Sequence, residues 1–194
     1  MPDEPENLGL SALMVLQDSR RDARINQQGE LVTLEEQDRS LWDRKEIDEG
    51  LRLVDGALRL HRVGVYQLQA AIAAIHAEAQ TAEQTDWPQI VALYRELMRI
   101  TPSPIVALNH AAAVAMSEGF EKGLTLAEES GATGKLDQYY LFHAARADLL
   151  RRLNRLQEAT TAYKRALALT TNHVEKQFIR RRLSEVIKTN GPLH

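Results

Sequence analysis

Residues 138–171, "QYYLFHAARADLLRRLNRLQEATTAYKRALALTT", contain the pattern that decides the fold. Ala147 lies in a first helical segment. A second segment follows a short polar turn and carries Ala159, Tyr163 and Ala166 at successive spacings of 12, 4 and 3 residues. Small side chains let two helices approach closely, and the aromatic ring fills the gap to the next pair. The pattern therefore predicts an antiparallel helix pair that packs on a neighbouring pair.

Two earlier segments repeat this layout. Residues 65–102 place Tyr94 in the register of Tyr163, and residues 104–131 place Ala127 there, with separations of 33 and 36 residues. These units resemble tetratricopeptide repeats, in which a helix pair recurs about every 34 residues. At least three such pairs are needed for a stable stack.

The predicted fold is therefore all-α. We expect a right-handed α-solenoid of three tetratricopeptide-like helix pairs and a capping helix over residues 65–189. An N-terminal helix and an extended connector, within residues 1–64, precede it and pack on the array. Asp86 is a good N-cap, and Pro88 lies in the first turn of its helix, where a missing N–H costs nothing. Residues 190–194 are predicted to be a disordered tail.

The connector differs from the Ala- and Leu-rich sequence around it. It reads "GELVTLEEQDRSLWDR", residues 29–44. Helices are expected on either side, at residues 8–24 and at about 40–62, because apolar residues recur there at helical spacing. Residues 30–34 alternate like a short strand but have no obvious hairpin partner.

Composition bounds the class of protein. The chain has 194 residues, of which 44% are hydrophobic, enough to bury one good core. Cysteine is absent, which excludes disulfides and thiolate metal sites and fits a reducing compartment. No apolar stretch is long enough to span a bilayer, and the acidic beginning is not a signal peptide. A cytoplasmic protein without a membrane partner is therefore expected.

Catalytic and metal-binding motifs are not evident. The six histidines lack metal-ligand spacing, and no Gly-rich phosphate loop or nucleophile motif occurs. We predict no enzyme activity, no metal and no cofactor. An enzyme that uses the loop at residues 35–43 is an open alternative, with Glu35, Glu36 and Asp38 as general acids or bases.

Charge is distributed unevenly. Residues 1–49 carry 6 basic and 13 acidic side chains, net −7, whereas residues 141–194 carry 11 and 4, net +7. The basic clusters at residues 151–155 and 179–183 contain consecutive arginines, which spread around a helix and do not form one stripe along a phosphate backbone. A solvated convex face is expected there, and direct DNA binding is the alternative.

A concave groove lined by the first helix of each pair is the sharper candidate site. It could hold an extended peptide or an adjoining domain through charge-assisted hydrogen bonds. A clamp for a peptide C-terminus is not expected, because Ala112 occupies the position of the required second Asn. The alternative is that these polar residues only satisfy neighbouring helices. The candidate residues are Tyr66, Gln67, Gln69, Asn109, Asp148, Arg151 and Arg152.

Six blocks of sequence, in this order, resemble one group of bacterial RNA polymerase sigma factors. These are extracytoplasmic-function (ECF) sigma factors with a tetratricopeptide-like C-terminal extension, and the resemblance covers about residues 3 to 185. The blocks are "GLSALMVLQDSRRDAR", "GELVTLEEQDRSLWDR", "YQLQAAIAAIHA", "TDWPQIVALY", "SPIVALNHAAAVA" and "FHAARADLLRRL".

The resemblance implies an accessory domain that contacts the sigma regions or RNA polymerase and regulates transcription initiation. Such sigma factors begin with two promoter-binding regions, one with a helix-turn-helix, and neither is found in this sequence. The chain alone is therefore not expected to recognise a promoter, and DNA would be contacted only through the missing regions. Met1 is expected to begin a C-terminal fragment or a free-standing paralogue. A generic tetratricopeptide adaptor that binds an extended peptide is the alternative.

The connector has two open interpretations. In the first, it lays the first helix on the array, with Trp42 as the anchor and with buried or half-buried polar pairs. In the second, the same residues face the sigma core together with Arg20 and Arg21. The polar residues in question are Asp38, Arg39, Asp43 and Arg44.

Overall fold

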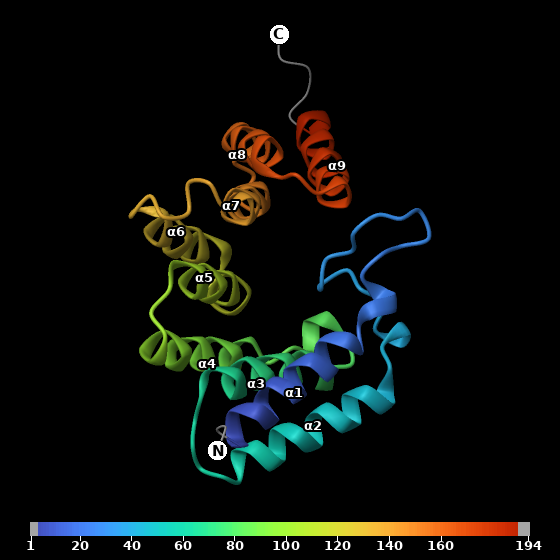
Figure 1. The fold of residues 1–194 in the computed structure, drawn as a ribbon. Helices are drawn as coiled ribbons and strands as arrows, with labels where there is room; N and C mark the ends of the chain where they lie inside the picture. Colours follow the sequence, from blue (N-terminus) through green and yellow to red (C-terminus); the bar gives the residue numbers. More distant parts are fainter. Residues whose placement is uncertain (1–3, 190–194) are drawn as a thin grey trace. The chain divides into compact units, whose positions relative to one another are not determined.

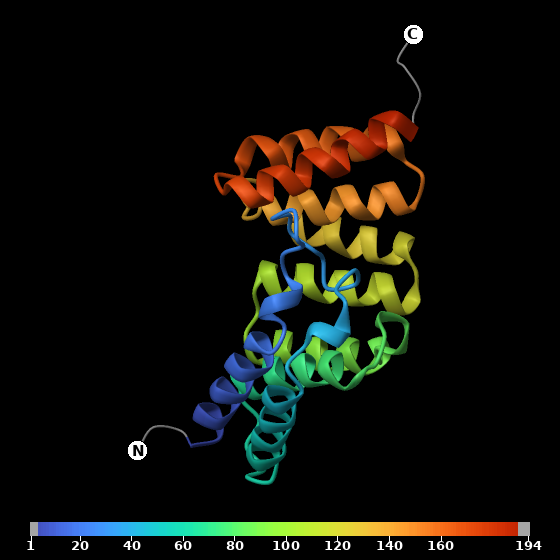
Figure 2. The same ribbon diagram turned by 90° about the vertical axis from the view of Figure 1, so that its right-hand side faces the viewer.

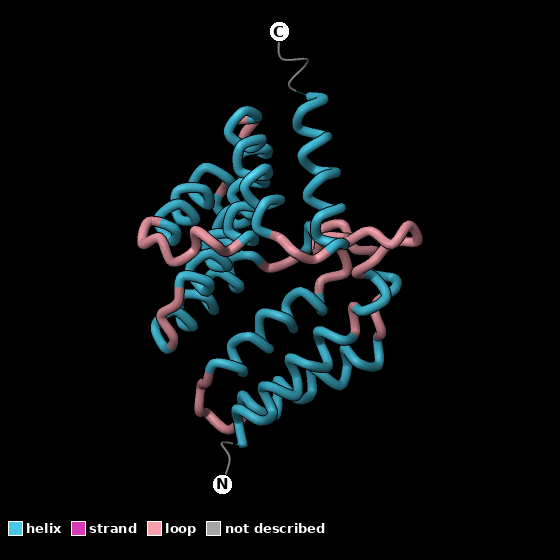
Figure 3. Tube along the Cα trace, turned by 45° about the horizontal axis from the view of Figure 1, so that its top comes forward, coloured by secondary structure: helices cyan, strands magenta, loops and turns pink. Residues whose placement is uncertain are grey.

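The computed structural model describes residues 4–189, which form helices joined by turns and loops, and this confirms the predicted all-α class. The described residues form no strand, and Figure 3 shows only helices and loops. The predicted disordered tail at residues 190–194 lies outside the described residues. The α-helices are α1 (Glu4–Asp18), α2 (Arg44–Leu58), α3 (Val65–Glu78), α4 (Trp87–Ile100), α5 (Pro104–Glu118), α6 (Phe120–Gly131), α7 (Tyr140–Arg152), α8 (Leu156–Leu169) and α9 (His173–Thr189). Three short 3₁₀ helices lie at Arg21–Ala23, Arg39–Leu41 and Ala82–Gln84.

Contacts divide the chain into two compact units, Met1–Pro102 and Ser103–His194. We call them the first unit and the second unit. The boundary expected between residues 64 and 65 lies inside the first unit, because α3 packs against both α1 and α2. The first two helices are therefore part of the same core as α3.

In the first unit, α1 lies against α2 and α3, and α3 also contacts α4 (Figure 1). Apolar side chains from α1, α2, α3 and the connector share one core. Helix α1 ends before the predicted residue 24, because Ser19 turns its hydroxyl back onto the Leu16 carbonyl and a 3₁₀ turn follows. Helix α2 begins after the predicted residue 40, because Asp43 caps its first turn. The buried members of this core are Ala12, Leu16, Ala23, Trp42, Ile47, Val54, Ala70, Ala74 and Ala77.

Helices α1 and α3 approach each other closely near the beginning of α3. A β-carbon on Gly9 would lie 2.6 Å from the backbone nitrogen of Gln67, so only glycine fits between the two helices here. On the same side of α1, the Glu6 carboxylate accepts hydrogen bonds from the backbone amides of Tyr66 at 3.1 Å and Gln67 at 3.4 Å. Gly64 at the N-cap position of α3 has no side chain that could accept hydrogen bonds from these amides. Glu6 therefore supplies the cap from another helix.

The loop between α1 and α2 contains the residues whose alternation resembles a short strand. Residues 30–34 form no strand; Leu31 makes a single isolated bridge with Ile25. A turn between them is closed by the Asn26 side chain, whose oxygen accepts from the amides of Gln28 and Glu30. Alternation over five residues cannot build a strand when the facing segment is this short.

In the second unit, each helix from α5 to α9 packs on the next one along the chain (Figure 2). The predicted ladder is buried: Ala147, Ala159, Tyr163 and Ala166 are at most 1% exposed. Its counterpart between α5 and α6 is tighter, because a β-carbon on Gly123 would come within 2.9 Å of a backbone oxygen. Small side chains therefore set the distance between paired helices, as the sequence pattern indicated.

Replacement by alanine should have opposite effects on the free energy of unfolding at two helical glycines of the first unit. Gly9→Ala forces α1 away from α3 and should lower the free energy of unfolding by about 1–3 kcal/mol. Gly56→Ala meets no atom within 4 Å and should raise it by about 0.5–1 kcal/mol, through helix propensity. Urea denaturation followed by tryptophan fluorescence reports on this unit, since Trp42 and Trp87 both lie in it. Equal effects of the two substitutions would contradict the close approach.

Candidate functional site

The connector is fixed to the end of α3 by one buried arginine. Arg39 is 7% exposed, and its guanidinium donates to the backbone carbonyls of His76 at 2.8 Å and Ala79 at 2.6 Å. It also donates to the Thr85 hydroxyl at 3.2 Å. The last carbonyls of a helix lack partners within the helix and carry its negative dipole end. Arg39 therefore supplies both the hydrogen bonds and the positive charge that the end of α3 requires.

Trp42 holds this arginine in place. Its ring is 3% exposed, and the guanidinium carbons of Arg39 and Arg20 lie 4.8 Å and 5.7 Å from the ring centroid. Both contacts have cation–π geometry. One residue further on, the backbone amide of Asp43 donates to the Ser19 carbonyl at 2.8 Å. The connector thus joins the end of α1 to the end of α3, with Trp42 buried between them.

The expectation of buried or half-buried polar pairs around Trp42 is wrong for three of the four residues. Asp38, Asp43 and Arg44 are exposed, and the two carboxylates cap helices. Asp38 accepts from the amide and the hydroxyl of Ser40, and Asp43 accepts from the amides that begin α2. Short acidic side chains just before a helical turn satisfy amide donors locally, so they need no cationic partner. Arg21 is also exposed and pairs with Asp18 of α1.

Positive charge is concentrated beneath the connector. Burial, and then the charges of Arg24 and Arg39, lower the pKa of Arg20 to about 10. Burial, followed by the charges of Arg20 and Arg39, lowers the pKa of His76 to about 4. The His76 ring packs edge-on against Trp87 with a centroid distance of 5.2 Å. His76 is therefore neutral at neutral pH, and this interior resists a further positive charge.

The groove residues predicted in the first unit do not form one surface. Gln67 is only 4% exposed, so its side chain is not available to a partner. Tyr66 is exposed at the beginning of α3, and Gln69 is half-buried. In the second unit, Asn109 is exposed on α5.

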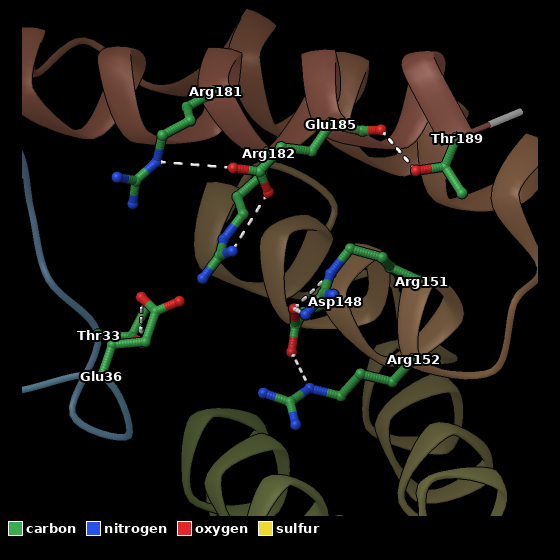
Figure 4. Close-up of polar contacts among 9 residues, drawn as sticks. All are labelled: Thr33, Glu36, Asp148, Arg151, Arg152, Arg181, Arg182, Glu185 and Thr189. Atoms are coloured by element: carbon green, nitrogen blue, oxygen red, sulfur yellow. Dashed lines mark hydrogen bonds and ion pairs between the residues drawn. The ribbon is translucent and has the colours of Figure 1, made fainter. Parts of the chain in front are cut away.

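Asp148, Arg151 and Arg152, by contrast, lie together on α7 (Figure 4). The Asp148 carboxylate accepts from Arg151 at 2.6 Å through one oxygen and from Arg152 at 2.7 Å through the other. The Arg152 guanidinium also lies over the Phe120 ring, 5.1 Å from its centroid. These contacts hold two half-buried guanidinium groups in fixed orientations.

Helix α9 adds two arginines to the same unit (Figure 4). Arg182 lies 3.2 Å from the Glu185 carboxylate and Arg181 lies 4.0 Å from it. Both guanidinium carbons lie within 5.6 Å of the Phe178 ring centroid. We call Arg151, Arg152, Arg181 and Arg182 the arginine cluster. Arg181 and Arg182 are half-buried, which corrects the expectation of a solvated convex face for residues 179–183.

Two arginines of the cluster keep the Asp148 carboxyl ionised. Burial of the Asp148 carboxyl opposes ionisation, but the hydrogen bonds from Arg151 and the charge of Arg152 outweigh it, and the pKa of Asp148 is lowered. Burial, together with the Asp148 charge, raises the pKa of the Tyr163 hydroxyl to about 12. Guanidinium groups oriented by rings and carboxylates suit the recognition of carboxylates or phosphates.

Comparisons with known proteins find a family match over the first helices. A protein family described as "Family of unknown function (DUF6596)" matches residues 1–58. The chain is also similar to an uncharacterized protein of Rhizobium meliloti (strain 1021), with 49% identity over 185 residues. That alignment covers 95% of this chain and 43% of the relative, so the chain spans less than half the relative's length. No solved structure matches the chain significantly.

The described residues lack two further features. None of the helices there has the length and apolar character to cross a membrane. In that same part of the chain, no three His, Cys, Asp or Glu side chains are grouped so that they could hold a metal ion.

Replacement of Arg39 should destabilise the first unit. Arg39→Gln leaves two helix-terminal carbonyls and the Thr85 hydroxyl without a charged donor, so we expect a loss of about 2–4 kcal/mol. Arg44→Gln, in the exposed part of the connector, should change the free energy of unfolding by less than about 0.5 kcal/mol. Urea denaturation measures both. Equal losses in the two variants would refute the assigned role of Arg39.

His76 should make the first unit less stable in mild acid. Its pKa in the folded state lies below the value of about 6.5 in an unfolded chain, so the unfolded state binds more protons between pH 6.5 and 4. Stability should therefore decrease as the pH falls through this window, by at most about 1.4 kcal/mol per pH unit. His76→Gln should remove that part of the slope. The control His61→Asn changes an exposed histidine and should keep it. A slope that survives in His76→Gln would contradict the assignment.

Proposed function

We propose that this chain is a regulatory protein-interaction domain of an ECF-type sigma factor. It acts in transcription initiation by contacting the sigma regions or RNA polymerase. The six ordered blocks of sequence support this role, and they extend over nearly the whole chain. The similar Rhizobium meliloti protein is more than twice as long as the aligned region, so a relative carries this region together with further sequence.

The proposed finer architecture is a right-handed stack of tetratricopeptide-like helix pairs. In the second unit, the successive packing of α5 to α9 and the buried ladder around Tyr163 support it. Helix stacks of this kind present surfaces for other proteins. Such a domain has no need of a cofactor or of catalysis, and its place of action is the cytoplasm, where transcription occurs.

The arginine cluster is the observation that carries the proposal. Its guanidinium groups are oriented before any partner arrives, by Asp148, Glu185 and two phenylalanine rings. Pre-orientation lowers the entropy cost of binding, and arginine suits the carboxylates of a protein surface. We therefore assign the contact with the sigma regions or polymerase to this cluster.

A generic adaptor that binds an extended peptide is the second candidate. The exposed Asn109 on α5 favours it, since an amide can hydrogen-bond to the backbone of an extended segment. In that case a peptide would contact α5 and α7, and transcription would not depend on this chain.

Run-off transcription with a protein in which this sequence is joined to sigma-factor promoter-binding regions tests the proposal. Deletion of residues 1–194 should change the transcript yield on the order of tenfold, the scale of a regulatory coupling. A fall would identify an activating domain and a rise an inhibitory one. The double variant Arg181→Gln/Arg182→Gln should shift the yield in the same direction as the deletion. Arg180→Gln removes an exposed charge from the same helix and should have no effect.

The proposal fails if the deletion leaves the yield unchanged. The assignment of the contact to the arginine cluster fails separately, if the deletion acts but the double variant behaves like Arg180→Gln. Circular dichroism of each variant shows whether the helices remain folded.

A further inference from the structure

The first unit has an open hollow between α1 and α2. Its volume is about 640 Å³. Its walls combine apolar and charged side chains. The lining residues are Met14, Val15, Gln17, Asp18, Arg21, Arg24, Glu46 and Glu49.

One wall of the hollow is apolar and exposed. Met14 of α1 is 65% exposed, the largest exposed fraction among the large hydrophobic residues of the described chain. Leu10 lies one helical turn earlier on α1 and is 37% exposed. Val15 adds a half-buried side chain. Flexible methionines on a surface suit the apolar face of an incoming helix.

The rest of the lining is charged. Glu46 and Glu49 of α2 and Asp18 of α1 line the hollow together with Arg21 and Arg24. One carboxylate oxygen of Glu46 is buried and has no hydrogen-bond partner among the described residues. The nearest cation is Arg21, 4.0 Å from the other oxygen, and Arg21 is also bound to Asp18. Burial, and then the charges of Asp18 and Asp43, raise the pKa of Glu46. An additional cation would therefore be favoured at this part of the lining.

We propose that this hollow binds a basic amphipathic helix of a partner protein. A lysine or arginine of that helix would contact Glu46 and Glu49, and its apolar face would cover Met14 and Val15. The charge of the lining agrees with this choice, since it holds three acidic side chains, Asp18, Glu46 and Glu49, and two basic ones, Arg21 and Arg24. An acidic helix would place its carboxylates beside Glu46 and Glu49, and a purely apolar one would leave these two side chains without a cation from the partner.

The hollow is independent of the proposed contact through the arginine cluster. That cluster lies on α7 and α9 of the second unit and selects acidic groups, whereas the hollow lies on α1 and α2 and selects basic ones. The two surfaces therefore call for different partners, or for different segments of one partner. Either proposal can fail while the other stands.

Isothermal titration of the 194-residue chain with synthetic peptides tests the hollow. The probe has about 14 residues, roughly four helical turns, with leucine on one face and lysine on the other. One control peptide replaces each lysine with glutamate, and a second replaces each leucine with glutamine. We expect binding of the first peptide alone. The interaction should weaken as the salt rises from about 50 mM to about 500 mM.

Variants of the chain locate the binding. Glu46→Gln/Glu49→Gln should raise the Kd for the leucine–lysine peptide by about tenfold, because two charged contacts are lost. Met14→Ser should also raise the Kd, because the apolar face of the peptide loses its contact with the Met14 side chain. Asp55→Asn removes an exposed acid from the opposite side of α2 and should leave the Kd unchanged.

Three results would overturn the proposal. They are equal binding of the glutamate peptide, equal binding of the glutamine peptide, and a Kd in the double variant that matches that of Asp55→Asn. The two control peptides use the unaltered chain, so they decide the question even if a variant fails to fold.

Discussion

The first unit depends on the hydrogen bonds that the Arg39 guanidinium donates at the end of α3. The end of α3 is covered by the connector, so its last carbonyls require donors from the protein. Arg39 donates to two of them and to Thr85, and Trp42 fixes its position. At the other end of α3, Glu6 accepts from the first amides. The helix is therefore held by an anion at its N-terminus and a cation at its C-terminus, both from distant parts of the chain.

This arrangement determines where charge remains available for function. Arg39 and Arg20 are committed to the interior, where burial, and then their charges, lower the pKa of His76. Asp38 and Asp43 are committed to helix caps. The connector is thus chiefly a structural element, which favours the first of its two interpretations. Charged groups suited to recognition lie elsewhere: an acidic and apolar hollow between α1 and α2, and the arginine cluster on α7 and α9. A domain with two surfaces of opposite charge is suited to hold partner segments of different composition, as the proposed regulation of a sigma factor would require.

Sequence patterns predicted those features that depend on neighbouring residues. Asp86 caps α4, with Pro88 in its first turn, and the ladder around Tyr163 is buried as its spacing indicated. Patterns failed where the partner lies far along the chain. Arg39 meets α3 about 40 residues later and Glu6 meets it about 60 residues later, and no periodicity encodes those separations. One interpretation of the connector placed Asp38 and Asp43 in buried or half-buried polar pairs, whereas both carboxylates are exposed and accept from backbone amides. Arg181 and Arg182 were expected to be solvated, since the stacking role of Phe178 depends on side-chain direction and not on spacing alone.

The contacts of Glu6 and Arg39 with the two ends of α3 make this helix part of one cooperative unit with α1 and the connector. Native-state hydrogen exchange measures this directly, through the opening free energies of amides within α1, α2 and α3. We predict that the slowest amides of α3 open with the same free energy as those of α1 and α2, because α3 cannot separate without the loss of both contacts. If α3 opens at a free energy lower by several kcal/mol while α1 and α2 stay protected, its ends are not held by Glu6 and Arg39, and the account is wrong.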